Sequence, residues 1–179
     1  MEWLNPPQQW QADEAIIRIT TLPKTDFWRT THYGFIRDDG HFYYQEAAGD
    51  FTYSAKISGD YRDLYDQAGL MVRLDEFNWI KCGIELVEGI QKASVVVTRE
   101  YSDWSVIPLS GNPASIWFRV KRSGDTLEAA YSLDGSAYTM MRLAYFPPVA
   151  SVKTGVMCAS PTGKGFQAVF EDVQFTAEE

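Results

Sequence analysis

Cysteine and histidine are scarce in this sequence, with two residues of each in a chain of 179. Cys82 and Cys158 both lie among apolar, strand-like residues, and such a setting is typical of buried, reduced thiols. The chain has no Cys-x-x-Cys pair, and His32 and His41 lie too far apart in the sequence to share one helical turn. These residues therefore predict neither a disulfide nor a zinc site.

Motifs for common cofactors and nucleophiles are also absent from the sequence. There is no Gly-x-Gly-x-x-Gly or phosphate-binding loop, and no Gly-x-Ser-x-Gly turn that would present a catalytic serine. We therefore predict no cofactor. Asp38 and Asp39 precede Gly40 and could hold a calcium ion, but a β-turn with solvated carboxylates explains them more simply. We accordingly predict no metal site.

A basic excess and long apolar runs are missing too. Lys and Arg total 16 against 24 for Asp and Glu, so the chain carries a formal charge of −8. This charge disfavours nucleic acid and anionic membranes as partners. No stretch approaches the roughly 20 apolar residues that span a bilayer, and residues 1–7 lack the pattern of a secretory signal. We expect a cytoplasmic protein with no nucleic-acid or membrane partner.

Aromatic residues, in contrast, are abundant: the sequence has 6 Trp, 10 Tyr and 10 Phe. Aromatic side chains are favoured on β-strands, so part of this content belongs to a β-rich core. Tryptophan also offers a flat apolar face with a polar N–H at its edge, which suits a ligand cleft. Both interpretations stay open. The chain length favours one domain that spans residues 1–179.

Alternation of apolar and polar residues at every second position dominates the chain and predicts short β-strands. Asp134-Gly135 adds a hairpin turn signal between two such segments, and residues 61–67 could form at most one helical turn. This pattern predicts an all-β fold, a two-sheet antiparallel jelly-roll sandwich. The expected strands are 15–20, 49–59, 68–74, 79–86, 94–99, 115–121, 127–132, 137–143, 154–159 and 166–175.

The polar faces of several expected strands hold more than solvated side chains. If these strands are neighbours, their outer faces form a groove of indoles, cations and a carboxylate, which suits the C–H faces and hydroxyls of a pyranose. The alternative is ordinary cross-strand packing and ion pairing on a solvated sheet. The outward residues are Met71 and Arg73; Trp79, Lys81 and Glu85; and Trp117, Arg119 and Lys121.

Four segments, residues 25–29, 65–70, 79–85 and 102–105, resemble an uncharacterised family of the concanavalin A-like lectin/glucanase superfamily. Its fungal relatives are called "regulation of enolase" proteins. The resemblance runs nearly end to end and implies a two-sheet jelly roll with a carbohydrate-type groove, but no established activity. The positions that it carries over are Asp26, Trp28, Asp66, Gln67, Trp79, Lys81, Glu85, Asp103 and Trp104.

Some of these positions have more than one interpretation. We expect Asp103 and Trp104 in a loop that forms a wall of the groove. Asp26 and Trp28 could instead be structural, as a turn-forming carboxylate and a buried indole. Arg119 joins the site only through the alternation of its strand. Together with Lys81 it would favour a sugar acid or a sugar phosphate over a neutral small sugar.

Catalysis stays an open question at this point. A glycosidase needs two carboxyl groups beside the scissile bond, and the Glu-x-Asp-x-x-Glu motif of the superfamily's glucanases is absent. Glu85 is the candidate acid/base, and its partner would have to be Asp66 or Asp103. We expect Lys81 to hold the pKa of Glu85 down, which is the opposite of what a general acid requires.

Three hypotheses therefore remain. The first is a domain that binds a carbohydrate or sugar derivative in the groove. The second is a glycosidase-like or epimerase-like enzyme that uses the same groove. The third is a protein-interaction or regulatory module whose outer aromatic residues pack against a partner or a second copy of the chain.

Overall fold

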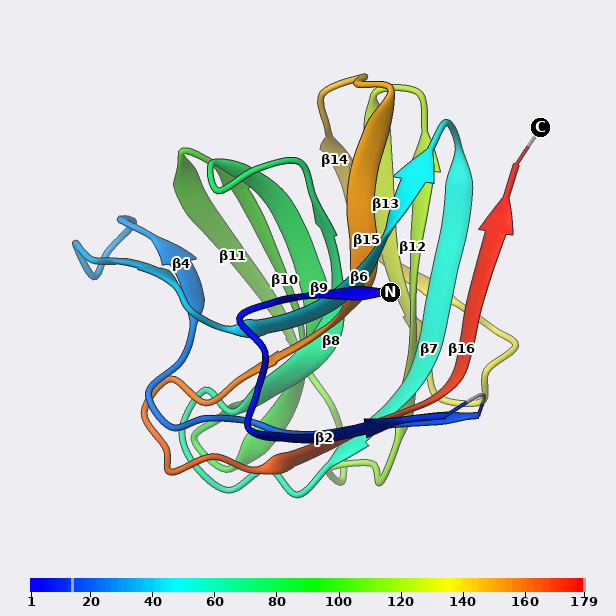
Figure 1. The fold of residues 1–179 in the computed structure, drawn as a ribbon. Helices are drawn as coiled ribbons and strands as arrows, with labels where there is room; N and C mark the ends of the chain where they lie inside the picture. The colour runs from blue at the N-terminus through cyan, green and yellow to red at the C-terminus, as the bar shows by residue number, and fades with distance from the viewer. Residues whose placement is uncertain (14, 179) are drawn as a thin grey trace.

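Two antiparallel sheets pack face to face in the computed structural model, which describes residues 1–13 and 15–178 (Figure 1). Sheet A contains, in spatial order, β1 (Glu2–Leu4), β6 (His41–Ala48), β15 (Ser151–Ala159), β8 (Gln67–Arg73), β9 (Asn78–Val87), β10 (Ile90–Arg99) and β11 (Tyr101–Pro108). Sheet B contains β14 (Thr139–Tyr145), β13 (Thr126–Ser132), β12 (Ile116–Ser123), β7 (Phe51–Gly59), β16 (Gln167–Ala177), β3 (Ile16–Thr20) and β2 (Gln9–Ala12). A separate hairpin is formed by β4 (Phe27–Arg29) and β5 (Ile36–Asp38).

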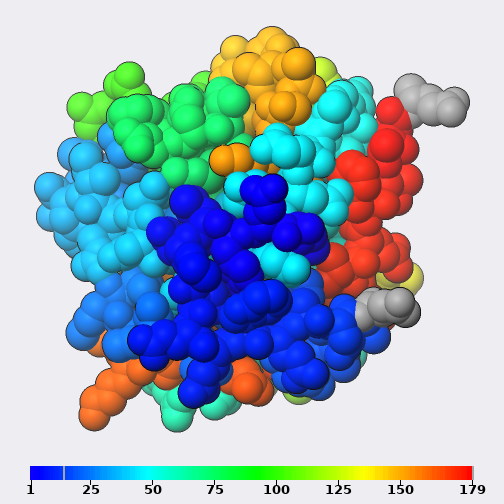
Figure 2. All heavy atoms as spheres, viewed as in Figure 1, coloured from blue at the N-terminus to red at the C-terminus, as the bar shows by residue number. Residues whose placement is uncertain are grey.

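The prediction of an all-β jelly-roll sandwich is confirmed. The alternation in β9 shows why the sequence folds this way: Ile80, Cys82 and Ile84 enter the core between the sheets, and Lys81 and Glu85 lie on the opposite face. Within residues 1–13 and 15–178, no helix is long and apolar enough to cross a membrane. The N-terminal residues spread over the front of the molecule, where β1 pairs with β6 (Figure 2).

Several strands differ from the expectation. Residues 101–108 form β11 rather than a loop, and residues 61–66 form turns and bends with no helical turn. Strand β6 was not expected because it is apolar on both faces. Its Tyr43 packs on the inter-sheet core, whereas Phe42 and Tyr44 pack on the outside of sheet A, so no alternation marks it.

A second, smaller core lies between the β4–β5 hairpin and the outer face of sheet A. The rings of Phe27 and Trp79 lie 6.2 Å apart here. Burial of these side chains holds the hairpin on the sheet, because each large apolar side chain removed from water contributes roughly 1.5–3 kcal/mol. The cluster consists of Phe27, Trp28, Phe42, Tyr44, Met71, Trp79, Val96 and Met157.

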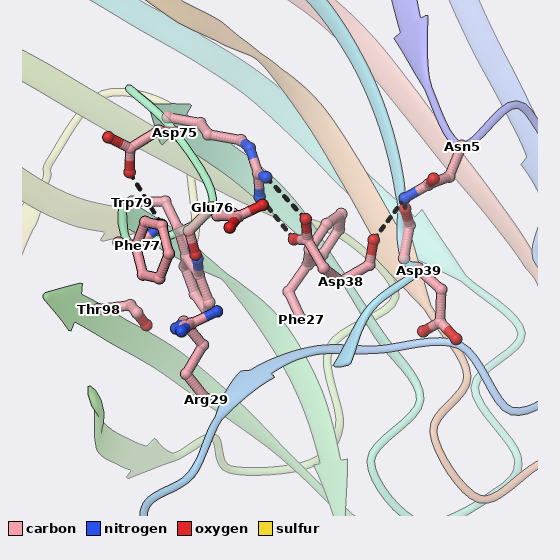
Figure 3. A network of polar contacts seen from close by, with 12 residues as sticks. Asn5, Phe27, Arg29, Asp38, Asp39, Asp75, Glu76, Phe77, Trp79 and Thr98 are labelled. Atoms are coloured by element: carbon pink, nitrogen blue, oxygen red, sulfur yellow. Dashed lines mark hydrogen bonds and ion pairs between the residues drawn. The ribbon is translucent and has the colours of Figure 1, made fainter. Parts of the chain in front are cut away.

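Polar contacts anchor the same hairpin (Figure 3). Arg73 on β8 donates hydrogen bonds from Nη1 and Nη2 to the two carboxylate oxygens of Asp38, each at 2.7 Å. Asn5 donates from Nδ2 to the backbone oxygens of Asp38 and Gly40, at 2.8 and 2.9 Å. The hairpin is thus fixed to β8 and to the segment after β1, and this position creates the pocket described next.

Candidate functional site

A pocket of about 280 Å³ lies between the hairpin and the outer face of sheet A. Its floor comes from β8, β9, β10 and β11, and its walls come from the hairpin, the 30–35 turn and the loops before β8 and after β15. The pocket is lined by Asp26, Trp28, Tyr33, Phe35, Arg37, Tyr65, Gln67, Lys81, Glu85, Val96, Trp104, Pro161 and Thr162.

Lys81 is the buried cation of the floor, with 5% of its surface exposed. Its Nζ donates to the backbone oxygen of Phe27 at 2.8 Å and to Oε1 of Gln67 at 2.5 Å. Oδ1 of Asp26 lies 3.6 Å from the same nitrogen. An ammonium group has three N–H donors, and three acceptors surround this one. Lys81 therefore serves mainly to hold the hairpin and the floor together.

Glu85 is the buried carboxylate of the floor, with 8% of its surface exposed. Its Oε2 accepts hydrogen bonds from Oγ of Ser94 and Nε1 of Trp104, both at 2.8 Å. Burial raises the pKa of Glu85, because removal from water penalises its charged form, and the nearby Lys81 charge and the two hydrogen bonds offset only part of this effect. The expected lowering by Lys81 is present, but the loss of water around the buried Glu85 outweighs it, so the pKa of Glu85 rises overall.

Aromatic rings form the upper walls of the pocket. Tyr33 and Phe35 stack with their ring centroids 5.5 Å apart, and Trp28 meets Tyr33 edge-on at 5.6 Å. The hydroxyl groups of Tyr33 and Tyr65 are hydrogen-bonded at 3.0 Å, and this bond, together with burial, raises the pKa of Tyr33 to about 12. Tyr65 meets Trp104 edge-on at 6.2 Å. The rings therefore form a nearly continuous apolar wall above the polar floor.

The structure brings most of the predicted residues together. Trp104 points into the pocket from β11, and its neighbour Asp103 is exposed and does not line the pocket, because successive strand residues point to opposite faces. Asp26 and Trp28 line the pocket. They also have the structural roles of the alternative interpretation: the Asp26 carboxylate accepts from the backbone N–H of Phe27, and the Trp28 indole is buried. The predicted residues in the pocket are Asp26, Trp28, Gln67, Lys81, Glu85 and Trp104.

Trp79 and Asp66 are buried outside the pocket. Trp79 is fully buried in the cluster beneath the hairpin, so it supports the wall and offers no surface to a ligand. Asp66 is also fully buried: its carboxylate accepts hydrogen bonds from the backbone N–H groups of Arg62 and Asp63 and from the Ser160 hydroxyl. Asp66 therefore shapes the loop before β8 and is no partner carboxyl for Glu85.

Arg119 lies on β12 of sheet B, so the expected groove that joins it to Lys81 does not exist. Its Nη2 contacts Oε1 of Glu128 at 3.3 Å, and its guanidinium lies 4.3 Å from the ring centroid of Tyr138. Trp117 and Lys121 share this strand. Alternation identified their outward direction correctly, but it cannot tell which sheet a strand joins.

Sequence reasoning missed Tyr33, Phe35, Arg37 and Tyr65 as pocket residues. The aromatic cluster in His32-Tyr33-Gly34-Phe35 was a usable signal, since it lies in a segment without strand alternation. Tyr65 was within a segment that carried the family resemblance.

Asp38 and Asp39, the two aspartates before Gly40, each form an ion pair with an arginine of the chain. Asp38 pairs with Arg73, and Oδ2 of Asp39 lies 2.9 Å from Nη2 of Arg37. Among the residues described by the structure, no group of three or more His, Cys, Asp or Glu side chains is placed to hold a metal ion.

The fold and the pocket define a two-sheet jelly-roll domain with a pocket on the outer face of one sheet. Its sandwich is shared with chains of low identity, such as a xylan beta-1,4-xylosidase from Bacillus halodurans, with a TM-score of 0.71 and 12% identity. The match covers 90% of this chain and 33% of that one. A mutant of the GH43 protein BlXynB from Bacillus licheniformis gives a TM-score of 0.75 at 14% identity over 98% of this chain and 37% of that one.

The chain belongs to the family described as "Protein of unknown function (DUF1349)", which matches residues 3–178. The "Regulation of enolase protein 1" of Saccharomyces cerevisiae is 39% identical over 175 residues, or 98% of this chain and 88% of that protein. The crystal structure of a functionally unknown protein from the same organism has a TM-score of 0.95 at 38% identity, over 99% of this chain and 96% of that one. The resemblance found in the sequence is confirmed.

Proposed function

We propose that this protein binds a small carbohydrate or sugar derivative in the pocket between the hairpin and sheet A. The observation that supports this most directly is the combination of a buried polar floor, Lys81, Gln67 and Glu85, with walls of aromatic rings. The C–H faces of a sugar pack on such rings, and its hydroxyls donate to and accept from such a floor.

The size of the pocket supports a ligand of one or two sugar rings. Its volume of about 280 Å³ lies at the lower end of the roughly 300–1,000 Å³ that small-molecule sites occupy. A polysaccharide chain would need an open cleft, whereas Tyr33 and Tyr65 meet across this pocket.

The donors of Lys81 limit the charge of the ligand. Its Nζ donates two hydrogen bonds within the protein and lies beside the carboxylate of Asp26, and Arg119 is on the other sheet. Neither cation is free for an anion, so a sugar acid or a sugar phosphate is disfavoured relative to a ligand without negative charge. Similar folds in a xylosidase and in an alginate lyase from Klebsiella pneumoniae, with a TM-score of 0.60 for the latter, agree with a carbohydrate role at the level of the fold.

A thermal-shift screen of neutral, acidic, phosphorylated and amino monosaccharides tests this proposal. We expect at least one sugar to raise the melting temperature, because a ligand that binds only the folded state stabilises it. Trp104→Ala should abolish the shift, and Arg119→Ala, a charged residue of the other sheet, is the matched control that should keep it. No shift from any sugar, or equal loss in both variants, would overturn the proposal.

A glycoside-active enzyme is the second candidate, and one observation favours it. Glu85 combines a raised pKa with a second carboxylate, Asp26, in the same pocket, and glycosidases pair two carboxyl groups in different environments. Release of nitrophenol from a panel of nitrophenyl glycosides measures this activity. Turnover that Glu85→Gln abolishes would establish the enzyme; no turnover at high protein concentration would leave binding as the function.

A further inference from the structure

Glu85 is a carboxylate without a cation of its own. Its Oε2 accepts two hydrogen bonds, but Oε1 accepts none from any residue that the structure describes, and no Lys or Arg forms an ion pair with it. The side chain nevertheless lines the pocket. A buried carboxylate without a pairing partner is costly. A positively charged ligand group beside Oε1 of Glu85 would therefore find both an opposite charge and a free hydrogen-bond acceptor.

The cations near the pocket are already matched. Lys81 lies beside Asp26, and Arg37 lies beside Asp39. Because each of these two positive charges already lies beside an aspartate, an ionised Glu85 leaves the group with one more negative charge than positive charges. The field inside the pocket therefore favours a positive ligand and disfavours a negative one.

The walls favour the same sign of charge. Trp104 donates its Nε1–H to Glu85, which places the indole beside the carboxylate, and Tyr65 meets this indole edge-on. Trp28, Tyr33 and Phe35 complete the wall. Aromatic faces attract cations, and the attraction is stronger when the cation is removed from water. An acid at the base of an aromatic enclosure suits an ammonium group better than a hydroxyl.

We propose that the ligand of this pocket carries a protonated amine, as an amino sugar or another amine-bearing polyol does, and that this ammonium donates to Oε1 of Glu85. The proposal rests on the proposed function and specifies its substrate class. The remaining hydroxyls of the ligand then face Gln67, Arg37 and the tyrosine hydroxyls, and the carbon skeleton packs against the rings.

Titration calorimetry with glucosamine, N-acetylglucosamine and glucose, at a pH where the amine of glucosamine is protonated, tests the inference. The three sugars share one ring and differ in the group at one carbon. We expect glucosamine to bind at least about tenfold more tightly than the other two, which corresponds to about 1.4 kcal/mol. Glu85→Gln should remove this preference. It keeps a side-chain oxygen for Ser94 and Trp104 but turns an NH₂ donor toward the ligand.

The outcomes separate the two proposals. Equal or weaker binding of glucosamine relative to glucose by the unaltered chain overturns the amine inference and leaves carbohydrate binding standing. Cyclohexylamine is the control for the charge alone: if it binds as tightly as glucosamine, the hydroxyls contribute nothing, and carbohydrate binding is overturned together with the amino-sugar ligand that rests on it. If neither the three sugars nor the amine binds, both proposals fail. The comparison on the unaltered chain does not depend on how well the Glu85 variant folds.

Discussion

The guanidinium of Arg73 and the carboxylate of Asp38 meet through two parallel hydrogen bonds of 2.7 Å, and this pair joins strand β8 of sheet A to strand β5 of the hairpin. Arg73 is buried, whereas a third of the Asp38 side chain is exposed. The pair lies outside the pocket, yet the hairpin that it anchors contributes Asp26, Trp28 and Arg37 to the pocket wall.

Asp38→Asn should destabilise the fold by about 2–3 kcal/mol, because it leaves the buried Arg73 cation without its partner; the partial exposure of Asp38 places the loss toward the low end. Urea denaturation measures this loss. Glu171→Gln, which breaks the partly exposed pair with Lys56, is the control and should cost at most about 1 kcal/mol. Equal losses in the two variants would contradict the anchoring role of Asp38.

Trp79→Ala should reduce the free energy of unfolding by about 3–5 kcal/mol, because Trp79 is fully buried beneath the hairpin and its removal leaves a large cavity. Denaturant titration followed by circular dichroism tests this. Trp104→Ala is the matched variant: Trp104 is 37% exposed, so its loss should cost less stability while it removes part of the pocket wall. If Trp79→Ala were more stable than Trp104→Ala, the assignment of Trp79 to the buried cluster and of Trp104 to the pocket wall would be contradicted.

Gly83→Ala should destabilise the protein by about 3 kcal/mol, since an added methyl group forces neighbouring backbone to move. A Cβ atom here would lie 2.2 Å from the backbone oxygen of Ala68 and 2.5 Å from the Cα atom of Gly69. Gly83 lies opposite Gly69 in the β8–β9 pairing, so both backbones would have to separate beneath the pocket. Thermal denaturation measures the loss, and an unchanged melting temperature would refute this close approach.

Glu85→Gln should change how stability depends on pH. Burial raises the pKa of Glu85 in the folded state above its unfolded value, so the folded state holds the proton more strongly. This contribution to stability is complete below the unfolded pKa and is lost as the pH rises through the folded pKa. We therefore expect the stability of Glu85→Gln relative to the unaltered chain to increase from acid to neutral pH.

Urea denaturation of both proteins at a series of pH values checks the slope. Thr139→Ala serves as the control, because Thr139 is an exposed, uncharged residue of β14 on the other sheet and should give a difference from the unaltered chain that varies little over the same range. A difference between Glu85→Gln and the unaltered chain that decreases with rising pH would show that the carboxylate is stabilised in its charged form.

The fold was readable from the sequence because most strands bury one face only. β7 and β9 alternate cleanly, and their apolar residues enter the core as expected. β6 escaped detection because Phe42 and Tyr44 are buried beneath the hairpin on the face that usually meets water. The hairpin itself is too short to show a pattern.

The pocket was only partly readable. Period-two alternation put Lys81 and Glu85 on one face, and the structure confirms that face. Alternation could not show that the hairpin covers the outer face of β9 at Trp79, because the contacts of Asp38 with Arg73 that fix the hairpin span 35 positions in the sequence. It also could not separate Arg119 on sheet B from Lys81 on sheet A. The cytoplasmic location, the single domain and a second copy of the chain as partner stay predictions.

Because the β4–β5 hairpin covers the pocket, ligand binding is coupled to the packing of this hairpin on sheet A. The pocket needs both Trp28 from the hairpin and Glu85 from the sheet, so a molecule whose hairpin has lifted off has no complete site. The measured dissociation constant equals the intrinsic one divided by the fraction of molecules with the hairpin seated. Substitutions at Asp38 or Asn5, which touch no ligand, will therefore weaken apparent affinity in proportion to the seated fraction that they remove.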